Sequence, residues 1–198
     1  MRVIGGHARG QRLKVPKGRS LRPTSARVKE ALFDILPHDL SGAKVLDLFA
    51  GTGNVTIEAL SRGAAEAILI DSSNESGKAI RENLRRLRLA ERTKVWVVPA
   101  TRAVRLLARR GETFDVIFLD PPYEEGWVAL TLKAVAEGGL LRPTGVLIAE
   151  HSFREQLQSR YGALVLVDQR RYGSTLLSFF KQEEQTRPTP EGLQDHVK

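Results

Sequence analysis

The chain has 198 residues, of which 41% are hydrophobic and 27% charged, a composition typical of one soluble globular domain. Its 31 Lys and Arg residues outnumber its 23 Asp and Glu residues, which gives a formal net charge of +8. The absence of cysteine excludes disulfides, thiolate metal sites and thiol nucleophiles, and it suits a reducing cytoplasm. No apolar run approaches the roughly 18 residues that a membrane span needs, and the first residues lack a signal-peptide core, so we expect neither membrane insertion nor export.

The positive charge is concentrated at the start of the chain. Nine basic residues and no acidic residue precede Glu30, whereas residues 30–198 hold 22 basic and 23 acidic side chains. Such a block favours a polyanion such as nucleic acid, and the alternative is a poorly ordered tail that aids solubility. Strand-like runs at 2–4 and 11–15, joined through glycines, predict a hairpin within the block.

Beyond the hairpin, Thr24 is a candidate N-cap for a helix that ends before Pro37. Apolar strands then alternate with helical patterns, which predicts a parallel sheet with helices on both faces. The predicted strands cover residues 45–49, 67–71, 95–98, 116–120 and 146–149.

Two further strand-like runs lie at 164–167 and 175–180. They are separated by Arg170-Arg171-Tyr172-Gly173, which leaves no room for a helix. These runs therefore predict an antiparallel hairpin that closes the sheet.

Three acidic residues, Asp47, Asp71 and Asp120, stand at or near the ends of predicted strands. Open parallel sheets bind ligands at the carboxyl ends of their strands, where the strand order reverses. A single acid there could merely cap the next helix, but three together, one of them beside a glycine turn, favour a binding site.

The first acid begins the segment Asp47-Leu48-Phe49-Ala50-Gly51-Thr52-Gly53, whose glycines let a ligand approach the backbone closely. The dinucleotide pattern G-x-G-x-x-G needs a small residue where this chain has Thr56, and it does not require an acid before the first glycine. The segment is instead typical of the methionine-binding part of an S-adenosylmethionine (SAM) site. Asp71 could accept both ribose hydroxyls of SAM or of NAD. The candidate cofactor-binding residues here are Asp47, Phe49, Gly51, Gly53 and Asp71.

The segment Asp120-Pro121-Pro122-Tyr123 follows the fourth predicted strand and is the sharpest chemical signal. An exocyclic amino group of a nucleobase is a poor nucleophile because its lone pair is delocalised into the ring. Asp120 and the Pro121 carbonyl could each accept one N–H and so direct the lone pair toward a methyl donor. Pro122 stiffens the loop, and the Tyr123 ring could stack on an extruded base. These four residues are the candidate catalytic residues, and the alternative is an ordinary proline turn.

Other chemistries find less support in the sequence. Methylation at pyrimidine C5 commonly needs a cysteine, which this chain lacks. The four histidines are scattered without metal-ligand spacing, so we expect no metal site. The chain also has no P-loop and no G-x-S-x-G motif.

From Arg2 to about Phe180 the sequence resembles the RsmD-type 16S ribosomal RNA guanine-N2 methyltransferases. The D-P-P-Y element is shared by many amino-methyltransferases, whereas an arginine-proline-threonine segment joined to a basic hairpin points to this family. The segments that carry the resemblance are Arg2-Val3-Ile4-Gly5-Gly6, Arg9-Gly10, Arg22-Pro23-Thr24, Arg27-Val28-Lys29-Glu30-Ala31-Leu32-Phe33, the Asp47–Gly53 segment, Glu58-Ala59-Leu60-Ser61-Arg62-Gly63-Ala64, Asp120–Tyr123 and Tyr172-Gly173-Ser174-Thr175.

The resemblance implies a Rossmann-like class I SAM-methyltransferase fold with a seven-stranded, mostly parallel sheet and a C-terminal antiparallel hairpin. It implies SAM as the methyl donor and a guanine in small-subunit rRNA, within an assembling particle, as the acceptor. It also places Thr24 near the cofactor. The candidate RNA-binding residues are Arg2, Arg9, Arg12, Arg22 and Arg27.

We therefore expect a basic N-terminal arm at 1–23, a catalytic domain at 24–181 and a disordered tail at 182–198, in a cytoplasmic monomer. Deleting residues 1–20 should then weaken RNA binding more than SAM binding. The alternatives left open are an adenine-N6 methyltransferase of DNA or RNA, an NAD-dependent dehydrogenase, and a non-catalytic RNA-binding protein on a degenerate methyltransferase fold.

The chain departs from the family pattern in three places. Asp71 stands where the family usually has Glu, and residues 99–103 lack the usual acid near the cofactor's adenine. Asn54-Val55-Thr56 replaces a small, glycine-containing stretch.

Overall fold

A computed structural model of the protein describes residues 1–15, 26–37 and 39–183, although not the side chains of residues 26 and 27. The strands are β1 (Lys44–Asp47), β2 (Glu66–Asp71), β3 (Thr93–Val97), β4 (Phe114–Leu119), β5 (Leu141–Ser152), β6 (Arg160–Tyr161), β7 (Leu164–Tyr172) and β8 (Thr175–Gln182). The helices are α1 (Ala26–Ile35), α2 (Asn54–Ser61), α3 (Asn74–Arg86), α4 (Ala100–Arg109) and α5 (Trp127–Gly138), with a short 3-10 helix, η1 (Ala90–Arg92).

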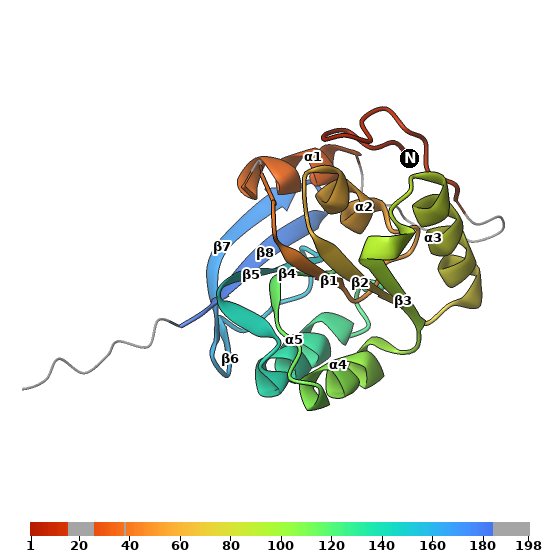
Figure 1. The fold of residues 1–198 in the computed structure, drawn as a ribbon. Helices are drawn as coiled ribbons and strands as arrows, with labels where there is room; N and C mark the ends of the chain where they lie inside the picture. The colour runs from red at the N-terminus through yellow and green to blue at the C-terminus, as the bar shows by residue number, and fades with distance from the viewer. Residues whose placement is uncertain (16–25, 38, 184–198) are drawn as a thin grey trace, which may run out of the picture.

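All eight described strands form one sheet in the order β3-β2-β1-β4-β5-β8-β7-β6 (Figure 1). Strands β1 to β5 pair in parallel, and β8, β7 and β6 extend the sheet by antiparallel pairing. The predicted class, a mostly parallel α/β sheet with a C-terminal antiparallel hairpin, is confirmed. Among the described residues, no helix is both long and apolar enough to cross a membrane.

The helices cover both faces of the sheet and create two hydrophobic cores. Helices α1, α2 and α3 pack on one face, and α4 and α5 pack on the other (Figure 1). Neighbouring residues of a strand point to opposite faces, so Val45 joins the first core and Leu46 joins the second. This two-sided burial explains why the central strands are continuously apolar in sequence.

Three strand assignments differ from the sequence prediction. The sheet has eight strands rather than seven, because Arg160–Tyr161 forms a two-residue strand against β7. Strand β5 is longer than the predicted 146–149, and its pairing with β4 shifts register between Phe114 and Val116. Strand β7 continues to Tyr172, which pairs with Thr175, so most of the predicted connection belongs to the strand. Arginines on the exposed positions of β7 had hidden this continuation.

The described part of the N-terminal arm is a hairpin packed into the protein. Arg2 and Arg12 form an antiparallel bridge, and the Val3 N–H donates to the Gln11 carbonyl at 2.9 Å. Val3 and Leu13 are buried in the same core as helices α1 to α3. The hairpin is therefore confirmed, and the solubility-tail interpretation does not hold for residues 1–15.

Candidate active site

The three strand-end acids flank the point where the strand order of the sheet reverses, between β1 and β4. Asp47 pairs in register with Leu69 of β2 and Phe118 of β4. Asp71 and Asp120 each lie two residues further along those neighbouring strands. The turn after β1 therefore has one carboxyl group on either side of it, an arrangement that follows from the strand order β2-β1-β4.

The glycine turn after β1 is tied to Asp71 by its backbone. The Gly51 N–H donates to Asp71 Oδ2 at 2.9 Å, and the Ser73 N–H donates to Oδ1 at 2.8 Å. These two bonds fix a half-buried carboxylate whose oxygens retain lone pairs for a ligand. Gly51 and Gly53 have φ values of +55° and +76°, which favour glycine, and a Cβ atom on Gly51 would meet nothing within 4 Å. The backbone at Gly51 thus borders open space, which fits a cofactor lying against the turn, whereas a Cβ atom on Gly53 would lie 3.2 Å from Leu69 Cδ2 in the core.

Asp47 is a buried carboxyl group at the end of β1. Thr56 Oγ1 donates to its Oδ2 at 2.8 Å, and the Phe49 N–H donates to Oδ1 at 3.3 Å. Burial, with a smaller contribution from the nearby Asp71, raises the pKa of Asp47 to about 7, although the two hydrogen bonds act to lower it. A cationic group placed beside Asp47 would hold it in the charged form. Thr56, which departs in sequence from both the dinucleotide pattern and the family pattern, is therefore a partner of this acid.

The Asp120–Tyr123 segment forms the other side of the site. Asp120 is half-buried, Pro121 is buried and Pro122 is exposed. The Tyr123 hydroxyl donates to Glu150 Oε1 at 3.0 Å and lies 3.1 Å from Thr175 Oγ1. Burial, together with the charges of Glu150 and Asp120, raises the pKa of Tyr123 above its usual range, so the hydroxyl stays protonated.

Sequence reasoning assigned no role to the two partners of the Tyr123 hydroxyl. Glu150 lies on β5 and Thr175 on β8, and both side chains are buried in the described structure. The only sequence signal for Glu150 is an acid near the end of an apolar strand. Its pairing with a tyrosine 27 residues away is a product of the fold.

A pocket of about 400 Å³ opens beside Tyr123. We name it the acceptor-side pocket. It lies between the loop after β4, the end of β5 and the β7–β8 turn. Its lining residues are Tyr123, Glu124, Ser152, Phe153, Arg154 and Ser174.

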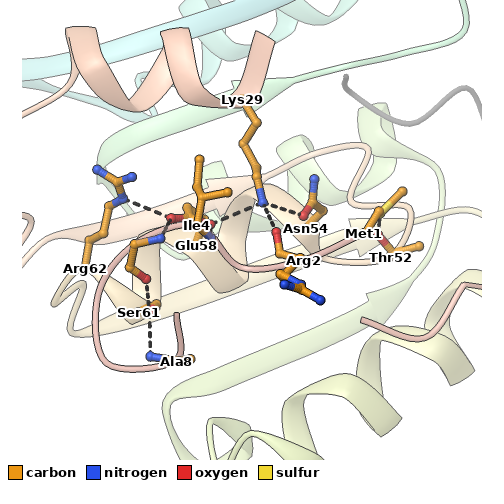
Figure 2. Close-up of polar contacts among 11 residues, drawn as sticks. Met1, Arg2, Ile4, Ala8, Lys29, Thr52, Asn54, Glu58, Ser61 and Arg62 are labelled. Atoms are coloured by element: carbon orange, nitrogen blue, oxygen red, sulfur yellow. Dashed lines mark hydrogen bonds and ion pairs between the residues drawn. The ribbon is translucent and has the colours of Figure 1, made fainter. Parts of the chain in front are cut away.

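A buried lysine connects the N-terminal hairpin to the glycine turn (Figure 2). Lys29 Nζ donates to Asn54 Oδ1 at 2.9 Å and to the Arg2 carbonyl at 2.7 Å, and it lies 3.2 Å from Glu58 Oε2. The other oxygen of Glu58 accepts the Gly5 N–H at 2.6 Å. Lys29 thus joins the hairpin and α1 to α2, whose first residue, Asn54, departs from the family's glycine-containing stretch.

The predicted RNA-binding residues are only partly within the described structure. Arg2, Arg9 and Arg12 are exposed on the hairpin. Arg22 and Thr24 lie outside the described residues, as does the side chain of Arg27. In the described part of the chain, no group of three or more His, Cys, Asp or Glu residues is arranged to hold a metal ion.

Comparison with known proteins places this site in a family. The family model described as conserved hypothetical protein 95 matches residues 1–181. The chain belongs to this family. It is the RsmD family that the sequence motifs resemble, so that prediction is confirmed.

Curated relatives and a solved structure of similar length agree with the RsmD assignment. The Bacillus subtilis (strain 168) protein YlbH is 37% identical over 92% of this chain and 99% of its own length. The ribosomal RNA small subunit methyltransferase D of Escherichia coli (strain K12) is 35% identical over 76% of this chain and 74% of its own length. A solved structure of the Escherichia coli protein YhhF superposes with a TM-score of 0.80 at 31% identity, covering 93% of this chain and 99% of that one.

Proposed function

We propose that this RsmD-family protein transfers a methyl group from SAM to the exocyclic N2 of a guanine in 16S rRNA. The observation that carries the proposal is the placement of Asp71 and the Asp120–Tyr123 segment on opposite sides of the Gly51 turn. Family membership and the name of the Escherichia coli relative support small-subunit rRNA as the substrate.

Cofactor binding falls to the β1 and β2 side of the site. SAM, when bound, supplies an electrophilic methyl group on a sulfonium. Asp71 can accept the ribose hydroxyls through the lone pairs that Gly51 and Ser73 leave available. Asp47 can hold a cationic group of the methionine part, which would draw its pKa down from about 7. Phe49 lies half-buried in the same turn.

Acceptor binding falls to the loop after β4. Asp120 accepts one N–H of the guanine amino group and the Pro121 carbonyl accepts the other, which leaves the nitrogen lone pair facing the methyl group. The Tyr123 ring stacks on the extruded base, and its hydroxyl is held by Glu150 and Thr175. Orientation therefore performs most of the catalysis, and the amino proton leaves late without a strong general base.

The proposal extends to the setting of the reaction. The acceptor is rRNA within an assembling small subunit, and the enzyme acts as a cytoplasmic monomer without a metal. The exposed arginines of the hairpin bind rRNA phosphates, which supply affinity without base choice.

The test is methyl transfer from labelled SAM to small ribosomal subunits, with the labelled nucleotide mapped afterwards. Asp120→Ala should lower kcat at least about a hundredfold, because the amino group loses its alignment, while the Kd for SAM changes less than about twofold. Glu125→Gln is the matched control, since Glu125 lies in the same loop and contacts only Trp127 among the described hydrogen bonds.

Each other outcome contradicts a stated part of the proposal. Label on adenine N6 would make the substrate assignment wrong. Equal loss of SAM binding and transfer in Asp120→Ala would make Asp120 a structural residue. Absence of transfer by the wild-type protein to any RNA would favour the non-catalytic RNA-binding alternative.

A further inference from the structure

An exposed aromatic ring covered by arginine lies next to the acceptor-side pocket. Phe153 follows the end of β5, and 38% of its surface is exposed. The guanidinium carbon of Arg171, from β7, lies 4.3 Å from the centroid of the Phe153 ring, and that of Arg154 lies 5.7 Å from it. Phe153, Arg154 and Arg171 therefore form one surface cluster, which we call the Phe153 cluster.

The backbone holds this cluster against the candidate active site. The Phe153 N–H donates to the Ser174 carbonyl at 3.0 Å, and Arg171 Nε donates to the Gly173 carbonyl at 2.8 Å. Phe153 and Arg154 also line the acceptor-side pocket together with Tyr123. The Phe153 cluster thus borders the place where the extruded base is proposed to stack.

The charges of the cluster are available to a ligand. In the part of the chain that the structure describes, neither Arg154 nor Arg171 forms an ion pair, whereas Arg170 pairs with Asp168 at 2.9 Å. Two acids lie nearby, and both contact Ser152. Glu124 accepts from its hydroxyl at 3.0 Å, and Glu155 accepts from its N–H at 3.3 Å.

We propose that the Phe153 cluster binds the nucleotide adjacent to the guanine that is methylated. Extruding one base from single-stranded RNA leaves the next base unstacked, and proteins hold such bases on aromatic rings and on guanidinium planes. The ring of Phe153 and the plane of Arg171 offer these surfaces, and Arg154 faces the neighbouring phosphate. This inference rests on the proposed function, because it takes RNA as the substrate. The Phe153 cluster would be a second RNA contact in addition to the basic hairpin, and it lies toward the edge of the sheet opposite β3.

The test compares variants for RNA binding and for methyl transfer. Phe153→Leu and Arg171→Gln should each raise the Kd for protein-free 16S rRNA and the KM for small subunits about tenfold, with the Kd for SAM unchanged. Arg171→Lys keeps the charge but loses the planar group, so it should retain most of that defect. Arg170→Gln is the control, because Arg170 points to the opposite face of β7 and should change neither constant more than about twofold.

Several results would overturn the inference. Unchanged Kd and KM in Phe153→Leu and Arg171→Gln would exclude an RNA contact at the cluster. A defect confined to whole subunits, absent with protein-free rRNA, would assign the surface to a ribosomal protein. Wild-type Kd and KM in Arg171→Lys would show that only the charge of Arg171 matters, which would contradict stacking on its guanidinium plane. The binding measurement needs no turnover, so inactivity of the wild-type protein would contradict the proposed function while leaving this surface to be judged by Kd.

Discussion

The strands set the positions of the single residues of the site, but their hydrogen-bond partners come from elsewhere in the chain. Asp71 and Asp120 each end an apolar run in the sequence, and Asp47 interrupts one just before the glycine turn, so all three could be recognised. Thr56 shows the opposite case, since its hydrogen bond to Asp47 depends on how α2 returns over the end of β1. The departure from the dinucleotide pattern at this position is thus a structural requirement of the buried acid.

Asp47→Asn tests the cost of that buried acid. The folded protein holds the pKa of Asp47 at about 7, above the ordinary 3.8, so between these values only the unfolded chain releases the proton as pH rises. The stabilisation that protonated Asp47 contributes is therefore present below about pH 4 and is lost as pH rises through about 7. An amide does not titrate, so the stability of Asp47→Asn relative to wild type should increase by about 2–3 kcal/mol from pH 5 to pH 8.

Urea unfolding without cofactor at the two pH values measures this difference. Asp34→Asn, which removes a carboxylate at an exposed position on α1, serves as the control for the loss of a surface charge. If the stability of Asp47→Asn relative to wild type were the same at both pH values, the pKa of Asp47 would not be raised in the folded protein. The same variant should bind SAM more weakly, because the amide cannot hold a cation.

At the scale of elements, a buried ion pair joins the N-terminal hairpin, α1 and α2. The side chains of Lys29 and Glu58 are 2% and 0% exposed, respectively, and Arg62 Nε lies 3.1 Å from Glu58 Oε1 (Figure 2). Burial lowers the pKa of Lys29, and Glu58 opposes that shift. Buried charges of this kind are costly to separate, because either one left alone has lost its hydration.

Lys29→Met should lower the free energy of unfolding by about 3 kcal/mol, at the lower end of the range for breaking a buried ion pair, because Glu58 loses its ammonium partner but keeps Arg62. The double variant Lys29→Met/Glu58→Gln should lose less free energy of unfolding than the two single variants lose when their losses are added. Urea unfolding of the four proteins in this double-mutant cycle measures the coupling.

The exposed pair Lys133–Glu137 provides the matched cycle. Its charged atoms are 3.9 Å apart and its side chains are 71% and 68% exposed, so its coupling should stay below about 0.5 kcal/mol. Additive losses in the Lys29 cycle would show that the two buried charges act independently.

The ends of a strand could be predicted well where both faces of the strand are buried. They were predicted less well where one face of the strand is exposed to solvent. The central strands β1, β2 and β4 came within two residues of their predicted ends. Strand β7 was predicted too short, because polar residues at its exposed positions resemble a turn. That error concealed the position of Arg171 on the sheet beside Phe153.

For the whole molecule, the structure changes what the uneven charge distribution means. The basic hairpin contributes Val3, Ala8 and Leu13 to the core, so it is not an appendage to a neutral domain. Deleting residues 1–20 would remove core side chains and the partners of Glu58 and Lys29. Such a deletion would affect folding and the cofactor turn together with RNA binding.

Substituting exposed arginines separates these effects. Arg9→Gln/Arg12→Gln should weaken binding to 16S rRNA. It should also make the slope of log affinity against log salt concentration less steep, by the amount expected for the loss of about one to two phosphate contacts. Stability and the Kd for SAM should stay unchanged, because both side chains are exposed. Lys133→Gln/Arg109→Gln, at exposed positions on α5 and α4, is the charge-matched control. Filter binding over a range of salt concentrations measures the slope, and an unchanged slope would exclude phosphate contacts by the hairpin.

The sequence alone was sufficient for the α/β class, the strand-end acids, the proline loop and the family, because these depend on local periodicity and on residues adjacent in the chain. Only the tertiary structure decided which side chains meet. Glu150 and Thr175 reach Tyr123 across separations of 27 and 52 residues, and Lys29 reaches Glu58 between two helices. The physical reason is that burial and hydrogen-bond partners are set by packing between distant elements. A buried lysine or glutamate therefore looks in sequence like any solvent-exposed charge.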